Sequence, residues 1–136
     1  MLNSIKAGDY VTFMVFARPS ERVKKILNRA RLGLLKKRKV ASTIGFGPRF
    51  LHSTGQLHKG GPASGVFIQL NHRAAKDLPI PGKPYSFEVL KQAQALGDFE
   101  SLKNKGRRSL RIVIDGSLES GLLKFTNLFL ESLNKP

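Results

Sequence analysis

The pattern of apolar and polar positions along the chain predicts strands that alternate with helices. The run Tyr10–Phe16 reads YVTFMVF, which is β-branched and aromatic without strict polar alternation. Such a run is typical of a strand that is buried on both faces, as in a parallel sheet. Comparable runs predict three further strands, over residues 40–46, 64–70 and 110–114.

A helical repeat of apolar residues follows the first predicted strand. Ser20 is a candidate N-cap, and Glu21 is well placed at the positive end of the helix dipole. The basic run KKRK at residues 36–39 complements the negative end of the same dipole. The apolar stripe of this helix is formed by Val23, Ile26, Leu27, Ala30 and Leu34.

The second half of the chain contains two helical segments that Gly97 is expected to separate. Ser86 is a candidate N-cap for a helix that runs to about Leu96, and Asp98 is a candidate cap for a short helix through Lys105. The residues expected on the buried face of the first segment are Phe87, Leu90 and Ala93. Those expected in the core from the second segment are Phe99 and Leu102.

Two other segments complete the pattern. Residues 78–84 (LPIPGKP) hold three prolines and a glycine, so they are expected to form an extended loop. Gly116 and Ser117 precede a last helix. Its buried side is expected to comprise Leu118, Leu122, Phe125, Phe129 and Leu133.

Strands and helices therefore alternate along residues 1–136, which we expect to form a single domain. Such alternation predicts an α/β fold, a three-layer αβα sandwich with a mainly parallel sheet of about four or five strands. Crossovers between parallel strands are right-handed, and ligands of such sheets bind outside the carboxyl ends of the strands.

Residues 45–62 (GFGPRFLHSTGQLHKGGP) are the segment richest in groups that bind ligands. Glycines and prolines bound it, and residues 51–59 are expected to form a short helix. Because the segment leaves the carboxyl end of the second predicted strand, we expect it to line a ligand site. Its polar side chains are Arg49, His52, Ser53, Thr54, Gln56, His58 and Lys59.

Composition narrows the classes of protein. The 136 residues are 40% apolar and 24% charged, which is typical of a folded domain, and no apolar run is long enough to span a bilayer. The N-terminus has no signal-peptide pattern, and there are no cysteines to form disulfides or thiolate metal sites. We therefore expect a cytoplasmic protein.

The charge balance is strongly basic and uneven. The chain has 24 Lys and Arg residues against 9 Asp and Glu, a formal net charge of +15. Residues 18–49 hold eleven of the basic residues and only one acid, Glu21. Such a patch is compatible with nucleic acid, an anionic metabolite or an acidic partner domain, and equally with a solvated helix face.

Several chemistries are disfavoured by what the segment lacks. Ser53 and Thr54 lie beside His52, but no nearby acid is available to orient the histidine, and no G-x-S-x-G motif occurs. His52 and His58 have no local carboxylate or cysteine with metal-ligand spacing. Because neither nucleotide-binding glycine motif is present, we expect no cofactor and no metal.

Three side chains are the candidates that remain. Lys59 is suited to act as a proton donor or an anion clamp, Gln56 to bind sugar hydroxyls, and Arg49 to hold a phosphate. Each is also compatible with an ordinary solvated position in a loop, and the residues alone leave both interpretations open.

The same segment carries a resemblance to a known family. GFGPRFLHSTGQLHKGGP, followed by DLPIPGKPYSFEVLKQAQALGDFESL and GRRSLRIVI, closely resembles the C-terminal end of bifunctional transaldolase/glucose-6-phosphate isomerase. The resemblance extends from about Gly8 to Ile114. It implies a sugar-isomerase subdomain of flavodoxin-like type, which agrees with the α/β fold predicted from the patterning.

The resemblance also implies roles for residues. Phosphoglucose isomerases move a proton between C1 and C2 of a sugar phosphate, and Lys59 is similar to the C-terminal lysine that helps to open the ring. Gln56 is similar to the glutamine that precedes it, and we expect His58, Ser53, Thr54 and Arg49 to contact substrate. The family's catalytic glutamate and arginine lie upstream of the matched segment.

These observations predict that the chain provides only part of an active site. We expect the chain to be the C-terminal part of a longer isomerase, inactive alone, that supplies Lys59 to a site shared with the upstream isomerase and transaldolase domains. A transaldolase barrel needs about 200 residues or more, so that activity is not expected here. The alternative is a non-catalytic basic domain that docks on an acidic partner or on nucleic acid, although no aromatic stacking platform favours nucleic acid.

Overall fold

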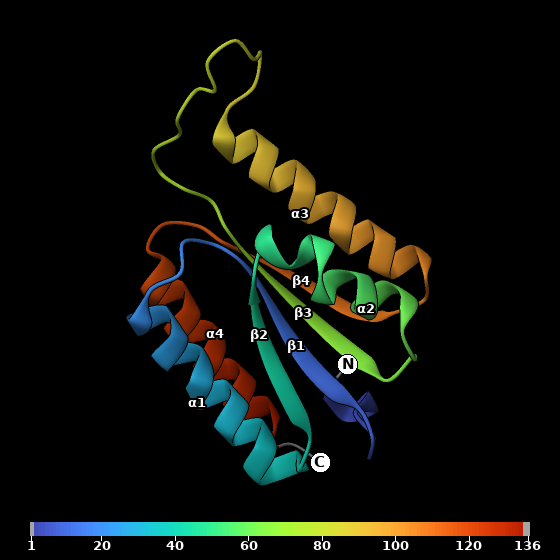
Figure 1. The fold of residues 1–136 in the computed structure, drawn as a ribbon. Coiled ribbons are helices and arrows are strands. Elements are labelled where there is room, and N and C mark those ends of the chain that lie inside the picture. Colours follow the sequence, from blue (N-terminus) through green and yellow to red (C-terminus); the bar gives the residue numbers. More distant parts are fainter. Residues whose placement is uncertain (1, 135–136) are drawn as a thin grey trace.

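The computed structural model describes residues 2–134 and contains one sheet of four parallel strands. The strand order is β2-β1-β3-β4, so the two central strands are not consecutive in the sequence (Figure 1). The strands are β1 (Tyr10–Phe16), β2 (Ala41–Phe46), β3 (Gly65–His72) and β4 (Arg108–Ile114). The fold is thus α/β with a wholly parallel sheet, and the predicted fold class is confirmed.

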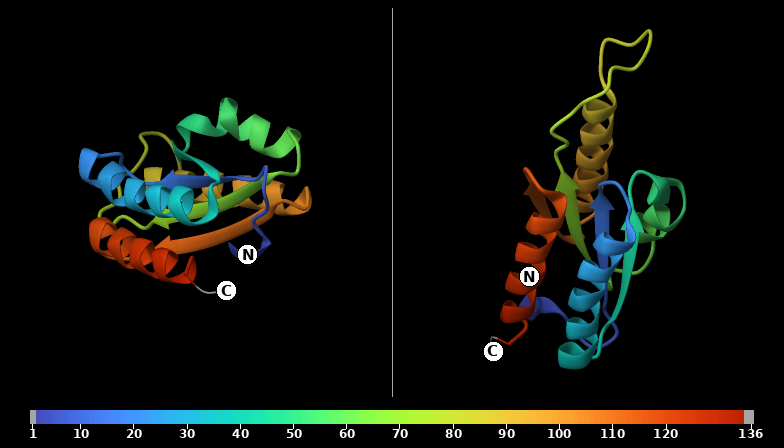
Figure 2. Two further views of the ribbon diagram at one scale, coloured as in Figure 1. Left: turned by 90° about the horizontal axis from the view of Figure 1, so that it is seen from below. Right: turned by 90° about the vertical axis from the view of Figure 1, so that its left-hand side faces the viewer.

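Helices cover both faces of the sheet and make three layers. α1 and α4 lie side by side on one face, while α2 and α3 cover the other (Figures 1 and 2). A 3-10 turn, η2 (Arg49–His52), precedes α2, and another, η1 (Leu2–Ser4), precedes β1. The helices are α1 (Glu21–Arg38), α2 (Thr54–Gly60), α3 (Phe87–Asn104) and α4 (Leu118–Ser132).

The core is divided by the sheet into two apolar clusters. On the α1–α4 face, alternate residues of β1 and β3 pack against both helices, with Phe13 fully buried against Phe125 and Phe129. On the other face the cluster is smaller and consists of Met14, Phe16, Phe50, Phe67, Ala95 and Leu102. The two central strands are buried on both faces, which confirms the prediction made for β1 from its apolar run.

The first helix, α1, confirms both the predicted N-cap and the predicted buried stripe. The Ser20 hydroxyl accepts a hydrogen bond from the backbone N–H of Val23, and Lys39 ends the helix in the left-handed conformation. The five apolar residues predicted to form its buried stripe are its buried residues. α4 is similar, because Leu122, Phe129 and Leu133 are buried and the other two predicted residues are partly buried.

The third helix corrects two predictions. Gly97 does not interrupt it, and Asp98 is not a cap but an interior residue of one continuous helix that Ser86 caps. Gly97 is exposed, so its missing side chain leaves no gap in the packing. The buried residues are Ala95, Asp98 and Leu102, whereas Phe87 is 54% exposed and Leu90 and Ala93 also face solvent.

The helix buries a different face from the expected one because its first turns extend past the sheet. The loop of residues 73–86, with its three prolines, projects beyond the carboxyl ends of the strands and delivers the chain to α3 from outside (Figure 2). Asp77 closes the base of this loop by accepting hydrogen bonds from the backbone N–H groups of Leu78 and Glu88. Only the later turns of α3 reach the core.

A partly enclosed ion pair fastens the opposite end of the sheet. The guanidinium of Arg108, at the start of β4, donates to both carboxylate oxygens of Asp9 at 2.7 Å, and it also donates to the carbonyl of Ser4. These hydrogen bonds hold the pKa of Asp9 well below its usual range, at about 2. The pair ties the N-terminal segment to the edge strand.

Candidate functional site

The segment rich in polar groups runs from one end of the sheet to the other. It leaves β2 at the carboxyl end, and η2 and α2 then bring the chain back beside the amino ends of the strands (Figure 1). The Tyr10 hydroxyl, at the first residue of β1, lies 3.2 Å from His58 Nδ1. A crossover between parallel strands must return to the amino ends of the strands. Only the start of the segment therefore lies at the carboxyl ends, where a ligand site was expected, and Lys59 lies near the amino ends.

Lys59 makes the most informative contact of the segment. Its Nζ lies 2.7 Å from Oδ1 of Asp98, and the two side chains are 17% and 2% exposed. The contact is an ion pair whose angles do not meet those of a hydrogen bond. Neither carboxylate oxygen of Asp98 has a hydrogen-bond partner among residues 2–134. The ammonium therefore lies at the rim of a buried carboxylate whose remaining acceptor capacity is unused.

The neighbouring histidine points inward. His58 is 6% exposed, and its ring packs on Phe67 with the centroids 5.0 Å apart while it hydrogen-bonds the hydroxyl of Tyr10. Burial lowers the pKa of His58, and the charge of Lys59 lowers it further, while Asp98 opposes both effects. Burial also raises the pKa of Tyr10. The imidazole is thus a neutral group inside the fold near neutral pH.

Acid is expected to destabilise the protein through His58. Because its folded pKa lies below the unfolded value of 6.5, the unfolded chain takes up a proton first as the pH falls. The stabilising contribution is full above about pH 6.5 and is lost as the pH falls from there through the lowered pKa. Thermal unfolding of His58→Gln between about pH 8 and about pH 5 should therefore show a flatter pH dependence than that of the unchanged chain.

The exposed His52 supplies a matched control for this experiment. His52→Gln removes an imidazole from the same segment without opening the core. An equal flattening in both variants would contradict the assignment of the pH dependence to His58.

The remaining predicted site residues lie on the outer surface of η2 and α2. Arg49 and Thr54 are exposed, the Ser53 hydroxyl donates to the carbonyl of Phe50, and the Gln56 amide donates to the carbonyl of Leu51 at 2.8 Å. Within the described part of the chain, no hydrogen bond or ion pair joins any of these four side chains to Lys59. The structure brings together His58 and Lys59, and it leaves the other four as a separate polar surface.

The glycines of the segment allow close packing. A Cβ at Gly55 would lie 2.9 Å from the carbonyl oxygen of Phe50, and one at Gly61 would lie 2.6 Å from that of Leu57. The carbonyl of Gly61 also accepts a hydrogen bond from Arg107, which donates to the carbonyl of Lys59 as well at 2.9 Å. The end of α2 is thereby fixed against the start of β4.

Sequence reasoning missed three partners of this site. Asp98 had been interpreted as a helix cap, Tyr10 only as a strand residue, and Arg107 only as part of a basic run. Asp98 lies on α3, Tyr10 begins β1 and Arg107 precedes β4, so each meets α2 only through the tertiary fold. Asp98 carried one usable signal, since it lies three residues after Ala95 and four before Leu102, on the face that proves buried.

The arrangement can position an ammonium group, and its lysine has donors beyond the one directed at Asp98. A lysine ammonium has three N–H donors, and Nζ of Lys59 is only partly enclosed. Among residues 2–134, no three His, Asp or Glu side chains converge in a way that would hold a metal ion. In the same described range, no helix is both apolar enough and long enough to cross a membrane.

Comparison with solved structures finds a similar fold in a natural protein and reports a designed protein as well. A hypothetical protein of Thermus thermophilus matches 91% of this chain with a TM-score of 0.73 and 18% sequence identity. The chain corresponds to only 34% of the length of that protein. A de novo designed Rossmann fold protein matches 90% of this chain with a TM-score of 0.49 and 12% identity, over 98% of its own length.

Sequence comparison adds no family assignment. No protein-family model matches the chain, and no curated protein sequence matches it. At 18% identity, the likeness to the Thermus protein establishes the fold alone.

Proposed function

We propose that the chain is the C-terminal sugar-isomerase subdomain of a bifunctional transaldolase/glucose-6-phosphate isomerase. In this proposal it contributes Lys59 to the interconversion of glucose 6-phosphate and fructose 6-phosphate. The proposal is supported by the resemblance of residues 45–62 to that family and by the α/β fold. The substrate is a water-soluble sugar phosphate, and a cytoplasmic location belongs to the same proposal.

The observation that carries the proposal is the ion pair of Lys59 and Asp98. An exposed loop lysine would have many rotamers, whereas this ammonium is held 2.7 Å from a carboxylate that is 2% exposed. A buried carboxylate with spare acceptor capacity fixes where Nζ lies, and a fixed donor is what proton transfer requires. Asp98 therefore acts as the positioning residue for Lys59.

The proposed chemistry is the opening of the sugar ring. The bond between C1 and the ring oxygen breaks, the ring oxygen takes a proton from Nζ of Lys59, and the C1 hydroxyl gives up its proton to a second base. The subsequent transfer of a proton between C2 and C1 needs a further base, which the family resemblance places upstream. This chain therefore supplies one group to a site that other domains complete.

The length of this chain relative to the similar Thermus protein is compatible with a site shared between domains. The chain spans about a third of the length of the similar Thermus protein, so a protein of that size would hold further domains around this one. Gln56, Ser53, Thr54 and Arg49 form an exposed polar surface beside the site, where substrate or an adjoining domain has access to them. His58 contributes to the proposed site by anchoring α2 to the sheet, because its ring packs on Phe67 and bonds the hydroxyl of Tyr10.

A glucose 6-phosphate isomerase assay tests the proposal. The 136-residue chain is assayed alone, then mixed with the separately produced upstream isomerase segment, and finally as part of the joined polypeptide. We expect turnover in the mixture and in the joined polypeptide, and none in either part alone. Absence of isomerase turnover from the joined polypeptide would overturn the proposal.

A further inference from the structure

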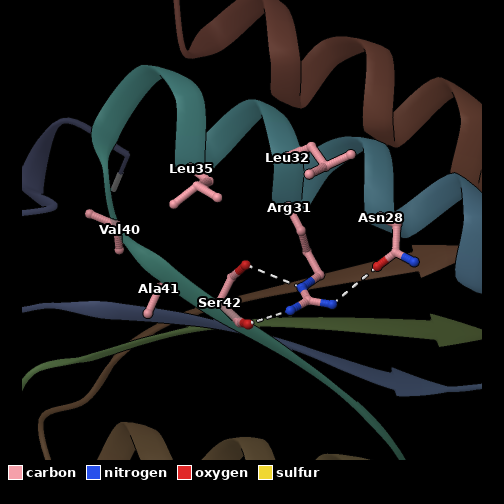
Figure 3. A pocket seen from close by; sticks show the side chains of 7 residues that line it. All are labelled: Asn28, Arg31, Leu32, Leu35, Val40, Ala41 and Ser42. Carbon is pink, nitrogen blue, oxygen red and sulfur yellow. Dashed lines mark hydrogen bonds between the residues drawn. The ribbon is translucent and has the colours of Figure 1, made fainter.

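A groove runs between α1 and β2 at the edge of the sheet opposite to β4. It encloses about 540 Å³. Its lining residues come from the helix and from the start of the strand that follows it (Figure 3), and they are Asn28, Arg31, Leu32, Leu35, Val40, Ala41 and Ser42. Leu32 and Leu35 are 56% and 54% exposed, so two large apolar side chains lie uncovered within it.

One wall of the groove is braced by a hydrogen-bonded arginine. The Arg31 guanidinium donates to the Ser42 hydroxyl at 3.3 Å, to the Ser42 carbonyl at 2.9 Å and to the Asn28 side-chain oxygen at 3.1 Å (Figure 3). The two bonds to Ser42 join α1 to β2 across the groove. One wall of the groove is therefore held to the other by Arg31.

The strand that forms the other wall has a free edge. Within residues 2–134, β2 pairs only with β1, and Gly47 N–H donates to the Val15 carbonyl on that inner side. Backbone groups alternate along a strand, so the N–H and C=O groups of Ser42, Ile44 and Phe46 point outward. Arg31 satisfies the carbonyl of Ser42, and the outward groups of Ile44 and Phe46 continue along the same free edge of the sheet.

The surroundings of the groove are strongly cationic. Lys36, Lys37 and Lys39 are exposed at the end of α1 beside the start of β2, and none forms a salt bridge with another described residue. Their position at the end of the helix is favoured by the helix dipole, but their ammonium groups remain exposed to solvent. Only one acid lies between residues 18 and 49, and Glu21 is already paired with Lys24.

These features together select one kind of occupant. We propose that the groove between α1 and the free edge of β2 binds an extended acidic segment of another protein, which adds to the sheet as a further strand. Its apolar side chains would cover Leu32 and Leu35, its backbone would pair with β2, and its carboxylates would meet the lysines at the end of α1. The inference does not depend on the isomerase proposal.

Two other occupants fit less well. Single-stranded nucleic acid is commonly held by aromatic stacking, and none of the seven lining residues is aromatic. Duplex DNA is held mainly through its phosphates, which would leave Leu32 and Leu35 uncovered. A second copy of this chain would bring two domains of net charge +15 together at a cationic edge. Both occupants are outcomes that the experiment distinguishes.

The test uses a fluorescent peptide, EEVTVTVEE, which has three apolar side chains on one face of an extended strand and carboxylates at both ends. Binding to the 136-residue chain is measured by anisotropy in about 0.15 M salt, where loose electrostatic attraction is screened. Two control peptides, KKVTVTVKK and EESTSTSEE, remove the complementary charge and the apolar side chains respectively. We expect only the first peptide to bind.

A matched pair of variants locates the binding site. Leu32 on α1 and Leu128 on α4 are each 56% exposed, so a change of either to glutamate alters charge and exposed apolar area equally. Leu32→Glu should weaken peptide binding by about tenfold or more, because it removes an apolar contact and introduces a repulsive charge. Leu128→Glu should leave the affinity within about twofold. Circular dichroism checks that both variants are folded.

Amide hydrogen exchange tests whether the peptide forms a strand. The amides of Ser42, Ile44 and Phe46 should exchange more slowly in the complex, while those of Thr43 and Gly45, which face β1, should change little. Protection without this alternation, equal effects of the two glutamate variants, or no binding of EEVTVTVEE would overturn the proposal. Tighter binding of duplex DNA than of EEVTVTVEE would likewise overturn the proposal and identify nucleic acid as the occupant. Self-association through this groove would overturn it and identify a second copy of the chain.

Discussion

Replacing Lys59 with methionine is expected to lower the free energy of unfolding by about 3–5 kcal/mol. The reason is Asp98, whose side chain is 2% exposed and whose only ion-pair partner within residues 2–134 is Lys59. Removing the ammonium leaves a buried carboxylate without compensation, and a single unpaired buried charge is among the most destabilising changes known in proteins. Urea or thermal unfolding of the isolated domain measures the effect directly.

The double variant Lys59→Met, Asp98→Ala separates the pair from its parts. It removes both charges, and alanine is the residue best suited to the interior of α3. We expect the double variant to recover most of the loss and to lie within about 1–2 kcal/mol of the unchanged chain. If the two single changes were simply additive, Lys59 and Asp98 would not interact energetically, and the positioning role of Asp98 would be refuted.

Replacing Lys59 with arginine in the joined isomerase is expected to lower kcat by about 100-fold or more. Arginine keeps a positive charge opposite Asp98, so the fold should persist, but its guanidinium does not give up a proton in proteins. The loss would therefore report on proton donation and not on stability. Steady-state assays with glucose 6-phosphate, together with circular dichroism, provide both measurements.

The matched control for this change is Lys103→Arg, because Lys103 lies on the exposed side of α3 near the end of that helix. It should retain full activity. A Lys59→Arg enzyme that turns over at the unchanged rate would show that Lys59 serves only to satisfy Asp98, and the catalytic part of the proposed function would then fail.

The parts of the fold that were predicted correctly are those that local sequence controls. Ser20 and the apolar stripe that follows it define α1 within one continuous segment. The buried strands β1 and β3 are likewise evident from apolar runs, because strands covered on both faces have no polar alternation. Each of these signals lies within the element that it specifies.

The parts that were not predicted depend on which element meets which. The sequence around Asp98 is compatible with a cap after Gly97, and only contact with α2 shows that the carboxylate is an interior partner of Lys59. Phe87 was expected to be buried because it shares a helical face with Leu90 and Ala93, yet it is 54% exposed and lies where α3 has not yet reached the sheet. The pairing of His58 with Tyr10 similarly requires the whole crossover to be in place.

The strand order also governs how the chain acquires its structure. β1 pairs on one side with β3, where Tyr10 lies opposite Gly65, so the central pair of strands closes only after α1, β2 and α2 have been synthesised. Such non-local parallel pairing is slow, because the entropy of loop closure is lost before any strand contact compensates for it. During that interval the apolar β1 has no β3 partner, and α1, which carries its own cap and stripe, is the element able to cover one of its faces first.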